Sequence, residues 1–428
     1  MLLRITLAVL ATLMFLGVSL HRWRRRSFGV GCLTAWRATL SASAWAMVLA
    51  GCGGGGGPAA PPPAPAAIDM DRVLDDFVAA NPRVSSVAML AVRNGAIVYS
   101  HTAGFMDAAR TRAPTRSTLY KTSSIAKLVI AVAIMQQVEQ GLLDLDQDVG
   151  NYLAFAVRNP AFPNQVITAR MLMKHGAGLA QPDPGTVTND VFAAFDSSVV
   201  VSLQPLMEEV LTPGNSNYRD GIWLAGAPGS VNKNSNAGML LLAHLVERLS
   251  GMPFSDYAKT HIFVPLGMIH TSHYFPDLDP NEVAALYDTQ NNLVSQTSNW
   301  FFPISGLFTS PEDWANFMRA MLDGGIFNGN RVLQQSSVDA MFAMTTPANN
   351  QLAYSSNIGL IWREAAVNPG WYGHTGAGSQ MTHVTEIEPA SGIGYVLFTN
   401  EGLIDGLVGP GSDLNRAIHQ WLRQLATS

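Results

Sequence analysis

Strand-like patterns occur near both ends of this 428-residue chain, and helical patterns fill the region between them. Residues 87–92 and 96–99 flank Asn94-Gly95, a pair that favours a two-residue hairpin turn. Further strands are expected at 359–362, 381–387 and 394–398, and helices at 167–174, 237–249, 311–322 and 414–425. Strands at both ends around a helical middle predict one sheet built from both termini, with the middle forming a second subdomain. A site for chemistry is expected at the seam between them.

The first 51 residues differ in charge from the remainder of the chain. They carry six arginines and no acidic residue. Removing these six from the 26 lysines and arginines leaves 20 against 31 aspartates and glutamates, a net charge of −11. Such a body lacks the basic surface that binds nucleic acid, so we expect no nucleic-acid partner. Both cysteines, Cys32 and Cys52, lie in or at the end of this leader, which excludes disulfides and cysteine metal sites from the body.

Residues 1–51 are interpreted as a signal segment. Arginines at 22–26 precede a mostly apolar stretch, and Leu49-Ala50-Gly51-Cys52 resembles the lipobox of bacterial lipoproteins. Cleavage there would leave a lipidated Cys52, followed by a glycine- and proline-rich tether. We therefore expect a leader at 1–51, a tether at 52–67 and a folded domain at 68–428. The domain would be lipid-anchored in the bacterial cell envelope, on the periplasmic side or at the outer membrane. The alternative is that the apolar run at 5–20 stays in the membrane as a signal anchor.

Ser124-Ile125-Ala126-Lys127 opens the long apolar run at 128–135. A serine and a lysine three residues apart at a helix start lie on one face, about one turn from each other. A desolvated lysine can take the proton of a neighbouring hydroxyl and so activate it as a nucleophile. Ser230 and Lys233 repeat the spacing, but in a segment that has the composition of a loop. The alternative for Ser124 is a simple N-cap on a core helix.

Two further segments fit an acyl-transfer site. His374-Thr375-Gly376 precedes a predicted strand, and its glycine would let the backbone approach a ligand closely. Asn234-Ser235-Asn236 precedes the helix predicted at 237–249. Each segment also has an ordinary interpretation, as a glycine-containing turn and as a helix N-cap.

Together these motifs make the chain resemble the serine β-lactamase and DD-peptidase superfamily. The resemblance is closest to the branch of class C β-lactamases, DD-carboxypeptidases and family VIII esterases, and it extends from about residue 68 to the C-terminus. It rests on the order of the three motifs along the chain, which is Ser124–Lys127, Asn234–Asn236 and His374–Gly376. It also rests on the linking segments at 135–145, 167–172, 265–268 and 305–307. It implies an α/β (α+β) fold: an antiparallel sheet of five or more strands flanked by helices, plus an all-helical subdomain. It also implies that no metal and no organic cofactor is needed.

The resemblance assigns a role to each motif residue. Ser124 would be the acylated nucleophile and Lys127 its proton partner. The backbone N–H groups of Ser124 and Ala377 would form the oxyanion hole. Asn236 would hydrogen-bond Lys127 and the substrate amide. The substrate would also contact Asn234 and the edge-strand element His374, Thr375 and Gly376, where a histidine replaces lysine and binds a carboxylate less strongly.

The departure from the family pattern is Asn234, which occupies the place of a tyrosine whose hydroxyl shuttles protons. A carboxamide has no proton to exchange near neutral pH. Two functions therefore remain open. The first is a serine hydrolase, slowed at this step, that acts on an ester, a D-amino-acid peptide or a β-lactam. The second is a catalytically impaired binding or regulatory lipoprotein of the envelope.

Overall fold

The computed structural model describes residues 66–180, 202–288, 290–297, 302–352, 355–378, 381–400 and 411–427. These residues belong to one compact unit, Pro65–Ser428. The predicted leader, Cys52 and nearly all of the tether lie outside the described residues. No helix in the described ranges is long and apolar enough to cross a membrane.

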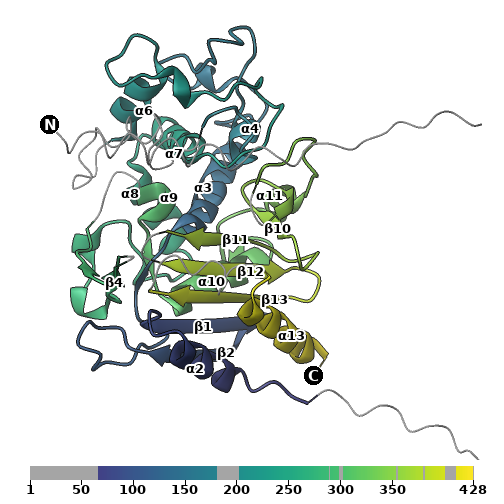
Figure 1. The fold of residues 1–428 in the computed structure, drawn as a ribbon. Helices are drawn as coiled ribbons and strands as arrows, with labels where there is room; N and C mark the ends of the chain where they lie inside the picture. Colours follow the sequence, from purple (N-terminus) through teal and green to yellow (C-terminus); the bar gives the residue numbers. More distant parts are fainter. Residues whose placement is uncertain are drawn as a thin grey trace, which may run out of the picture. The chain divides into compact units, whose positions relative to one another are not determined.

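A seven-stranded sheet forms the base of the unit, and its strand order is β2-β1-β13-β12-β11-β10-β9. All of its pairings are antiparallel. The N-terminal hairpin pairs with the last strand, so the sheet is built from both termini as predicted (Figure 1). The strands are β1 (Ser86–Arg93), β2 (Ala96–Gly104), β9 (Ser355–Ile358), β10 (Arg363–Ala365), β11 (Tyr372–Ala377), β12 (Thr382–Glu388) and β13 (Ile393–Thr399).

The hairpin between β1 and β2 turns at Asn94 and Gly95, as the sequence predicts. Both residues have positive φ, 49° and 75°. Two successive positive φ angles define the turn type that matches the twist of paired strands, and asparagine and glycine tolerate them best. The dipeptide therefore fixes the register of the first two strands.

Helices cover both faces of the sheet. In β1, Val87, Met89 and Ala91 face the cluster formed with α2 (Met70–Ala80) and α13 (Asp413–Thr427). The alternating residues at 88, 90 and 92 belong to the larger core, which includes α10 (Pro311–Leu322). Successive strand side chains point to opposite faces. Burial on both faces explains why β1 is a continuous apolar run.

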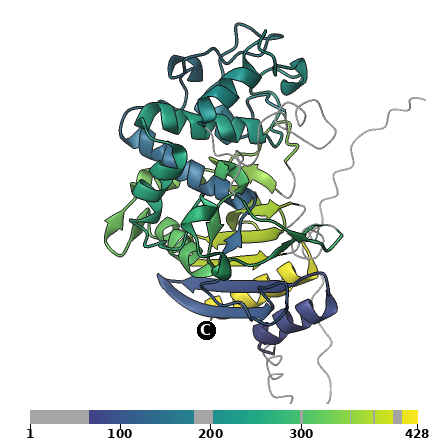
Figure 2. The same cartoon turned by 90° about the vertical axis from the view of Figure 1, so that its left-hand side faces the viewer.

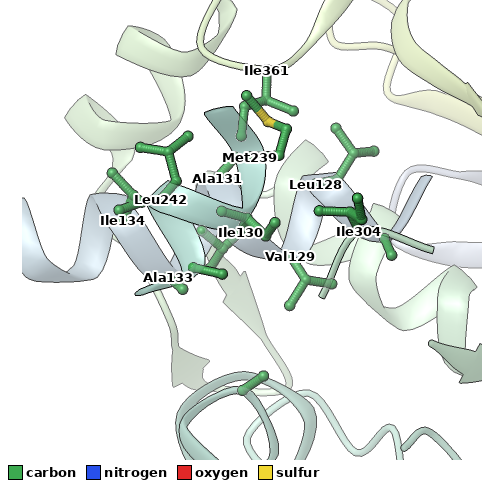
Figure 3. Close-up of a cluster of buried hydrophobic side chains, with 14 of the residues drawn as sticks. Leu128, Val129, Ile130, Ala131, Ala133, Ile134, Met239, Leu242, Ile304 and Ile361 are labelled. Carbon is green, nitrogen blue, oxygen red and sulfur yellow. The ribbon is translucent and has the colours of Figure 1, made fainter. Parts of the chain in front are cut away.

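The helical subdomain lies above the sheet in Figures 1 and 2. Its central helix, α3 (Lys127–Glu139), is buried at every residue from 127 to 137 and packs against α7 (Asn236–Ser250). Figure 3 shows Leu128, Ile130 and Ile134 of α3 with Met239 and Leu242 of α7. A helix buried on all sides needs no polar face.

Shorter elements complete the unit. The helices are α4 (Ala169–Met173), α6 (Leu203–Leu211), α8 (Phe254–Ala258), α9 (Phe302–Ser305) and α11 (Gln335–Phe342). Two-residue strands pair as β3 (Tyr120–Lys121) with β6 (Phe308–Thr309), β4 (Leu286–Tyr287) with β5 (Leu293–Val294), and β7 (Ile326–Phe327) with β8 (Asn330–Arg331). A π-helical turn, Lys259–Phe263, follows α8.

One predicted strand, 359–362, is wrong. These residues form the bend between β9 and β10, closed by the Gly359 N–H donating to the Trp362 carbonyl at 2.9 Å. Ile361 has a φ of 69°, which a strand excludes. Leu360, Ile361 and Trp362 are buried because the bend inserts them into the main core. A short apolar run indicates burial, and it does not by itself distinguish a strand from a buried turn.

Candidate active site

The nucleophile candidate lies at the junction between the subdomain and the sheet. Ser124 opens a single 3₁₀ turn, Ser124–Ala126, that continues directly into α3. The turn places the Nζ of Lys127 2.5 Å from the Oγ of Ser124. Ser124 is partly exposed, whereas Lys127 is completely buried. A reactant can therefore reach the hydroxyl while the amine stays out of water.

Burial changes the chemistry of Lys127. Desolvation, and next the positive charge of Arg363, lower the pKa of its amine to about 7. A large fraction of the amine is then unprotonated near neutral pH. Such an amine can accept the proton of the adjacent hydroxyl.

The last part of β11 runs beside Ser124. β12 pairs with β11 over its whole length, but β10 pairs only with Tyr372 and Gly373. The edge beyond Gly373 is thus left for the 3₁₀ turn, and the Ser123 Oγ donates to the Ala377 carbonyl at 2.9 Å. A methyl group at residue 376 would lie 3.3 Å from the backbone nitrogen of Ser124. Gly376 therefore allows the strand and the turn to approach, which brings Ala377 and Ser124, the two predicted oxyanion donors, together.

His374 is buried on this strand in a neutral state. Its Nδ1 donates to the Thr375 carbonyl at 2.6 Å, which assigns the ring proton to Nδ1. Burial, and then the charges of Arg363 and Lys127, hold the pKa of the ring well below its usual value. The buried Nε2 has no partner among the described residues. At neutral pH the ring is therefore uncharged and its Nε2 is a hydrogen-bond acceptor, which differs from the expected role as a weak carboxylate-binding cation.

The asparagine motif lies at the start of α7, which packs against α3. Ser235 caps the helix by accepting from the Gly238 N–H at 3.1 Å, and Asn236 is the first helical residue. Asn234 precedes the cap, and its side-chain oxygen accepts from the Arg363 guanidinium at 2.7 Å. The competing Ser230 lies in a loop, as expected, and its hydroxyl donates to the Ala227 carbonyl.

Arg363 and His175 form a polar cluster with Lys127, His374 and Asn234. Neither Arg363 nor His175 belongs to a sequence motif that would reveal it. Arg363 opens β10, and His175 follows α4 with a φ of 55°. The guanidinium lies 2.9 Å from the His175 Nε2, and the Ser235 N–H lies 3.2 Å from its Nδ1. In the sequence, Arg363 is 129 positions from Asn234 and 188 positions from His175, so only the fold brings these residues together. The one sequence signal is a basic residue after a buried apolar run.

The cluster has more hydrogen-bond donors than acceptors. A neutral imidazole accepts at one nitrogen only, so His175 can satisfy either Arg363 or the Ser235 N–H, but not both. Within the described part of the chain, no carboxylate forms an ion pair with Lys127 or Arg363. The site is therefore electropositive and suited to a group that develops negative charge.

A partly exposed serine and a buried lysine amine at hydrogen-bond distance form an S-x-x-K motif beside a strand edge that β10 leaves unpaired. The chain belongs to the Beta-lactamase family, a family of serine hydrolases, whose model matches residues 70–407.

Curated relatives include penicillin-binding proteins and putative D-alanyl-D-alanine carboxypeptidases. The chain is 31% identical to penicillin-binding protein 4* of Bacillus subtilis (strain 168), over 46% of this chain and 39% of that protein's length. It is 25% identical to penicillin-binding protein 4 of Amycolatopsis lactamdurans, over 68% of this chain and 74% of the relative. The first of these matches thus spans well under half of the relative.

Solved structures share the fold. The D-amino acid amidase of Ochrobactrum anthropi SV3, complexed with D-phenylalanine, superposes with a TM-score of 0.66 at 19% identity, covering 84% of this chain and 98% of that one. EstCE1, a hydrolase with promiscuous acyltransferase activity, gives a TM-score of 0.65 at 19% identity, covering 82% and 97%. The sequence predicts an antiparallel sheet with a helical subdomain, and this is the fold of the serine β-lactamase and DD-peptidase superfamily.

Proposed function

We propose that this protein is a serine hydrolase that forms an acyl-enzyme on Ser124. The observation that carries the proposal is the 2.5 Å contact between the Ser124 hydroxyl and an amine whose pKa is about 7. Lys127 takes the hydroxyl proton as Oγ attacks a carbonyl carbon. The tetrahedral oxyanion is then stabilised by the N–H groups of Ser124 and Ala377. The leaving group departs, and water later cleaves the acyl-enzyme.

Asn234 limits which substrates react well. An amide leaving group needs a proton as the bond to carbon breaks, whereas an activated alcohol leaves without one. A carboxamide held by Arg363 cannot supply that proton. We therefore infer that the protein acylates fastest with activated esters and more slowly with D-amino-acid peptides or β-lactams. Deacylation is the slow step, because the attacking water lacks the same proton carrier.

The second candidate function is that of a binding or regulatory protein that retains the pocket without turnover. The replacement of the proton-carrying tyrosine by Asn234 is the observation that favours it. Both candidates require a small-molecule acyl compound as ligand, and they differ in whether Ser124 becomes covalently modified.

Intact-mass spectrometry separates the two. The protein is exposed to a penicillin and, separately, to a p-nitrophenyl ester, and compared with Ser124→Ala. The expected result is one added acyl group on the native protein with the ester, and none on Ser124→Ala. Native protein that gains no mass with either reagent would favour the binding function.

We also propose that the mature protein is held in the bacterial envelope by lipid on Cys52. The support is the sequence alone, Leu49-Ala50-Gly51-Cys52 followed by a glycine-rich tether. Membrane fractionation of Cys52→Ala tests this, since loss of the lipid should release the protein into the soluble fraction. Unchanged membrane association would make the apolar run at 5–20 the anchor.

A further inference from the structure

Arg363 connects the sheet to the helical subdomain at the active site. It opens β10, and its guanidinium donates to the side-chain oxygen of Asn234 at 2.7 Å. The same group lies 2.9 Å from the Nε2 of His175, which follows α4. The bond to Asn234 therefore ties β10 to the segment of the subdomain that carries the asparagine motif.

This contact determines what Asn234 can offer. A guanidinium has only donors, so it must occupy the oxygen of the Asn234 amide. The amide then has its N–H groups and one remaining oxygen lone pair to offer the remainder of the site. A carboxamide exchanges no proton near neutral pH, so the catalytic proton must stay with Ser124 and Lys127.

On the basis of the hydrolase function proposed above, we propose that Arg363 is a positioning residue that clamps Asn234 and holds a positive charge in the cluster around Ser124 and Lys127.

The charges around Lys127 support this role. In the described part of the chain, the titratable and charged groups of the cluster are Arg363 on β10, His374 on β11 and His175 after α4. Desolvation lowers the pKa of Arg363 to about 10, so the guanidinium is still charged at neutral pH. Of the two neighbouring cations, Lys127, with a pKa of about 7, gives up its proton first. The result is a permanent positive charge beside an amine that can act as a base.

The test measures Lys127 directly. The chain has five lysines, so lysine isotope-labelled at Cε gives few NMR signals, and the signal lost in Lys127→Met identifies this residue. Its chemical shift is followed with pH in the native protein and in Arg363→Met, which removes the charge but keeps a long side chain. Two variants serve as controls. Arg363→Lys retains the positive charge at position 363. Lys259→Met removes a positive charge from a lysine that forms an ion pair with Asp277.

The expected result is an upward shift of the Lys127 midpoint in Arg363→Met. From a native midpoint of about 7, a rise of one pH unit leaves about fivefold less free amine at pH 7. Arg363→Lys should stay close to the native midpoint, and Lys259→Met should match it. The rate of Ser124 acylation by a p-nitrophenyl ester should shift along the pH axis in parallel. An unchanged Lys127 midpoint in folded Arg363→Met overturns the proposal, because a merely structural arginine would lower the rate without moving the midpoint.

Arg363→Gln provides an independent variant if Arg363→Met fails to fold. It removes the charge but keeps an amide donor for the Asn234 oxygen, so the Lys127 midpoint should again rise, and an unchanged midpoint overturns the proposal. The NMR readout needs no turnover. A native protein that shows the expected shifts but never acylates Ser124 would therefore refute the hydrolase function and leave the effect of Arg363 on Lys127 in place.

Discussion

Lys127 is a buried amine for which we propose a chemical role. Its Nζ contacts the Ser124 hydroxyl, and no carboxylate among the described residues pairs with it. Lys127→Met keeps the apolar stem and removes the base, so we expect acylation of Ser124 to fall by about 10²–10⁴-fold. Thermal stability should change little, because no buried ion pair is broken. Stopped-flow acylation with an activated ester and a melting curve check the two parts. Unchanged labelling would move the base elsewhere, with Lys233 the first residue to examine.

In the proposed mechanism, Asn234 is the residue at which proton delivery fails. Asn234→Tyr restores a hydroxyl, and the adjacent Arg363 charge should lower the pKa of the new phenol toward the working range. We expect turnover to rise about 10²-fold or more, with the larger gain on amide substrates, because a positioned acid–base group contributes about that much. Pre-steady-state kinetics should show an initial burst in the native protein that weakens in the variant. Brisk peptide turnover by the native protein would mean that another group already carries the proton.

At the scale of elements, the site depends on how closely β11 approaches the 3₁₀ turn before α3. Gly376→Ala places a methyl group 3.3 Å from the Ser124 backbone nitrogen and the Ser123 Cβ, tighter than these atoms tolerate without moving. We expect acylation to drop about tenfold or more, since a small displacement of an oxyanion donor is costly, while the protein remains folded. Gly378→Ala is the matched control, because its methyl group would lie 3.4 Å from the flexible Met381 Sδ and 3.9 Å from the Ser123 Oγ, both ordinary contact distances. Equal activity of the two variants would show that the approach is not critical.

The elements also show how far the sequence predicts this site. α10 and α7 were predicted to within a residue or two, since proline, serine and glycine mark their ends. The Ser124–Lys127 spacing is local, so a helical turn brings the two residues together without help from the fold. Arg363 and His175 could not be predicted, because their contacts join distant segments and neither has a sequence signature. The bend at 359–362 was mistaken for a strand, and that bend is what aims Arg363 into the site.

At the scale of the whole molecule, residues from both ends of the domain hold the sheet together. Arg93 at the end of β1 donates to the Leu425 and Ala426 carbonyls at the C-terminus of α13. Beneath α13, the buried Glu386 accepts from Tyr395 and contacts His419 at 2.7 Å. The strand that carries His374 and Gly376 lies inside this sheet, so the position of the active-site edge depends on contacts made by both termini.

Buried neutral histidines make the stability of the whole domain sensitive to acid. Burial lowers the pKa of His273 to about 3 and that of His383 to about 4. The unfolded chain takes up a proton at each near its ordinary pKa of about 6.5, while the folded chain stays neutral. Because the unfolded state binds more protons in this window, stability is lost as the pH falls from about 6.5 toward 4. Lys127 does not add to this loss of stability between about pH 6.5 and 4, because its amine is mostly protonated in both the folded and the unfolded chain below its folded-state pKa of about 7.

The loss is up to roughly 1.4 kcal/mol per histidine for each pH unit. Urea unfolding at several pH values between about 4.5 and 7 measures it. His273 lies among the rings of Phe254, Phe263 and Phe302, and neither ring nitrogen has a partner among the described residues. His273→Leu should therefore flatten the dependence by one histidine's share without loss of a hydrogen bond. His101→Gln is the control, because this histidine lies near the surface beside Asp75 and is not enclosed by aromatic rings of the described residues. The same steep acid loss in His273→Leu as in the native protein would show that His273 is not kept neutral by the fold.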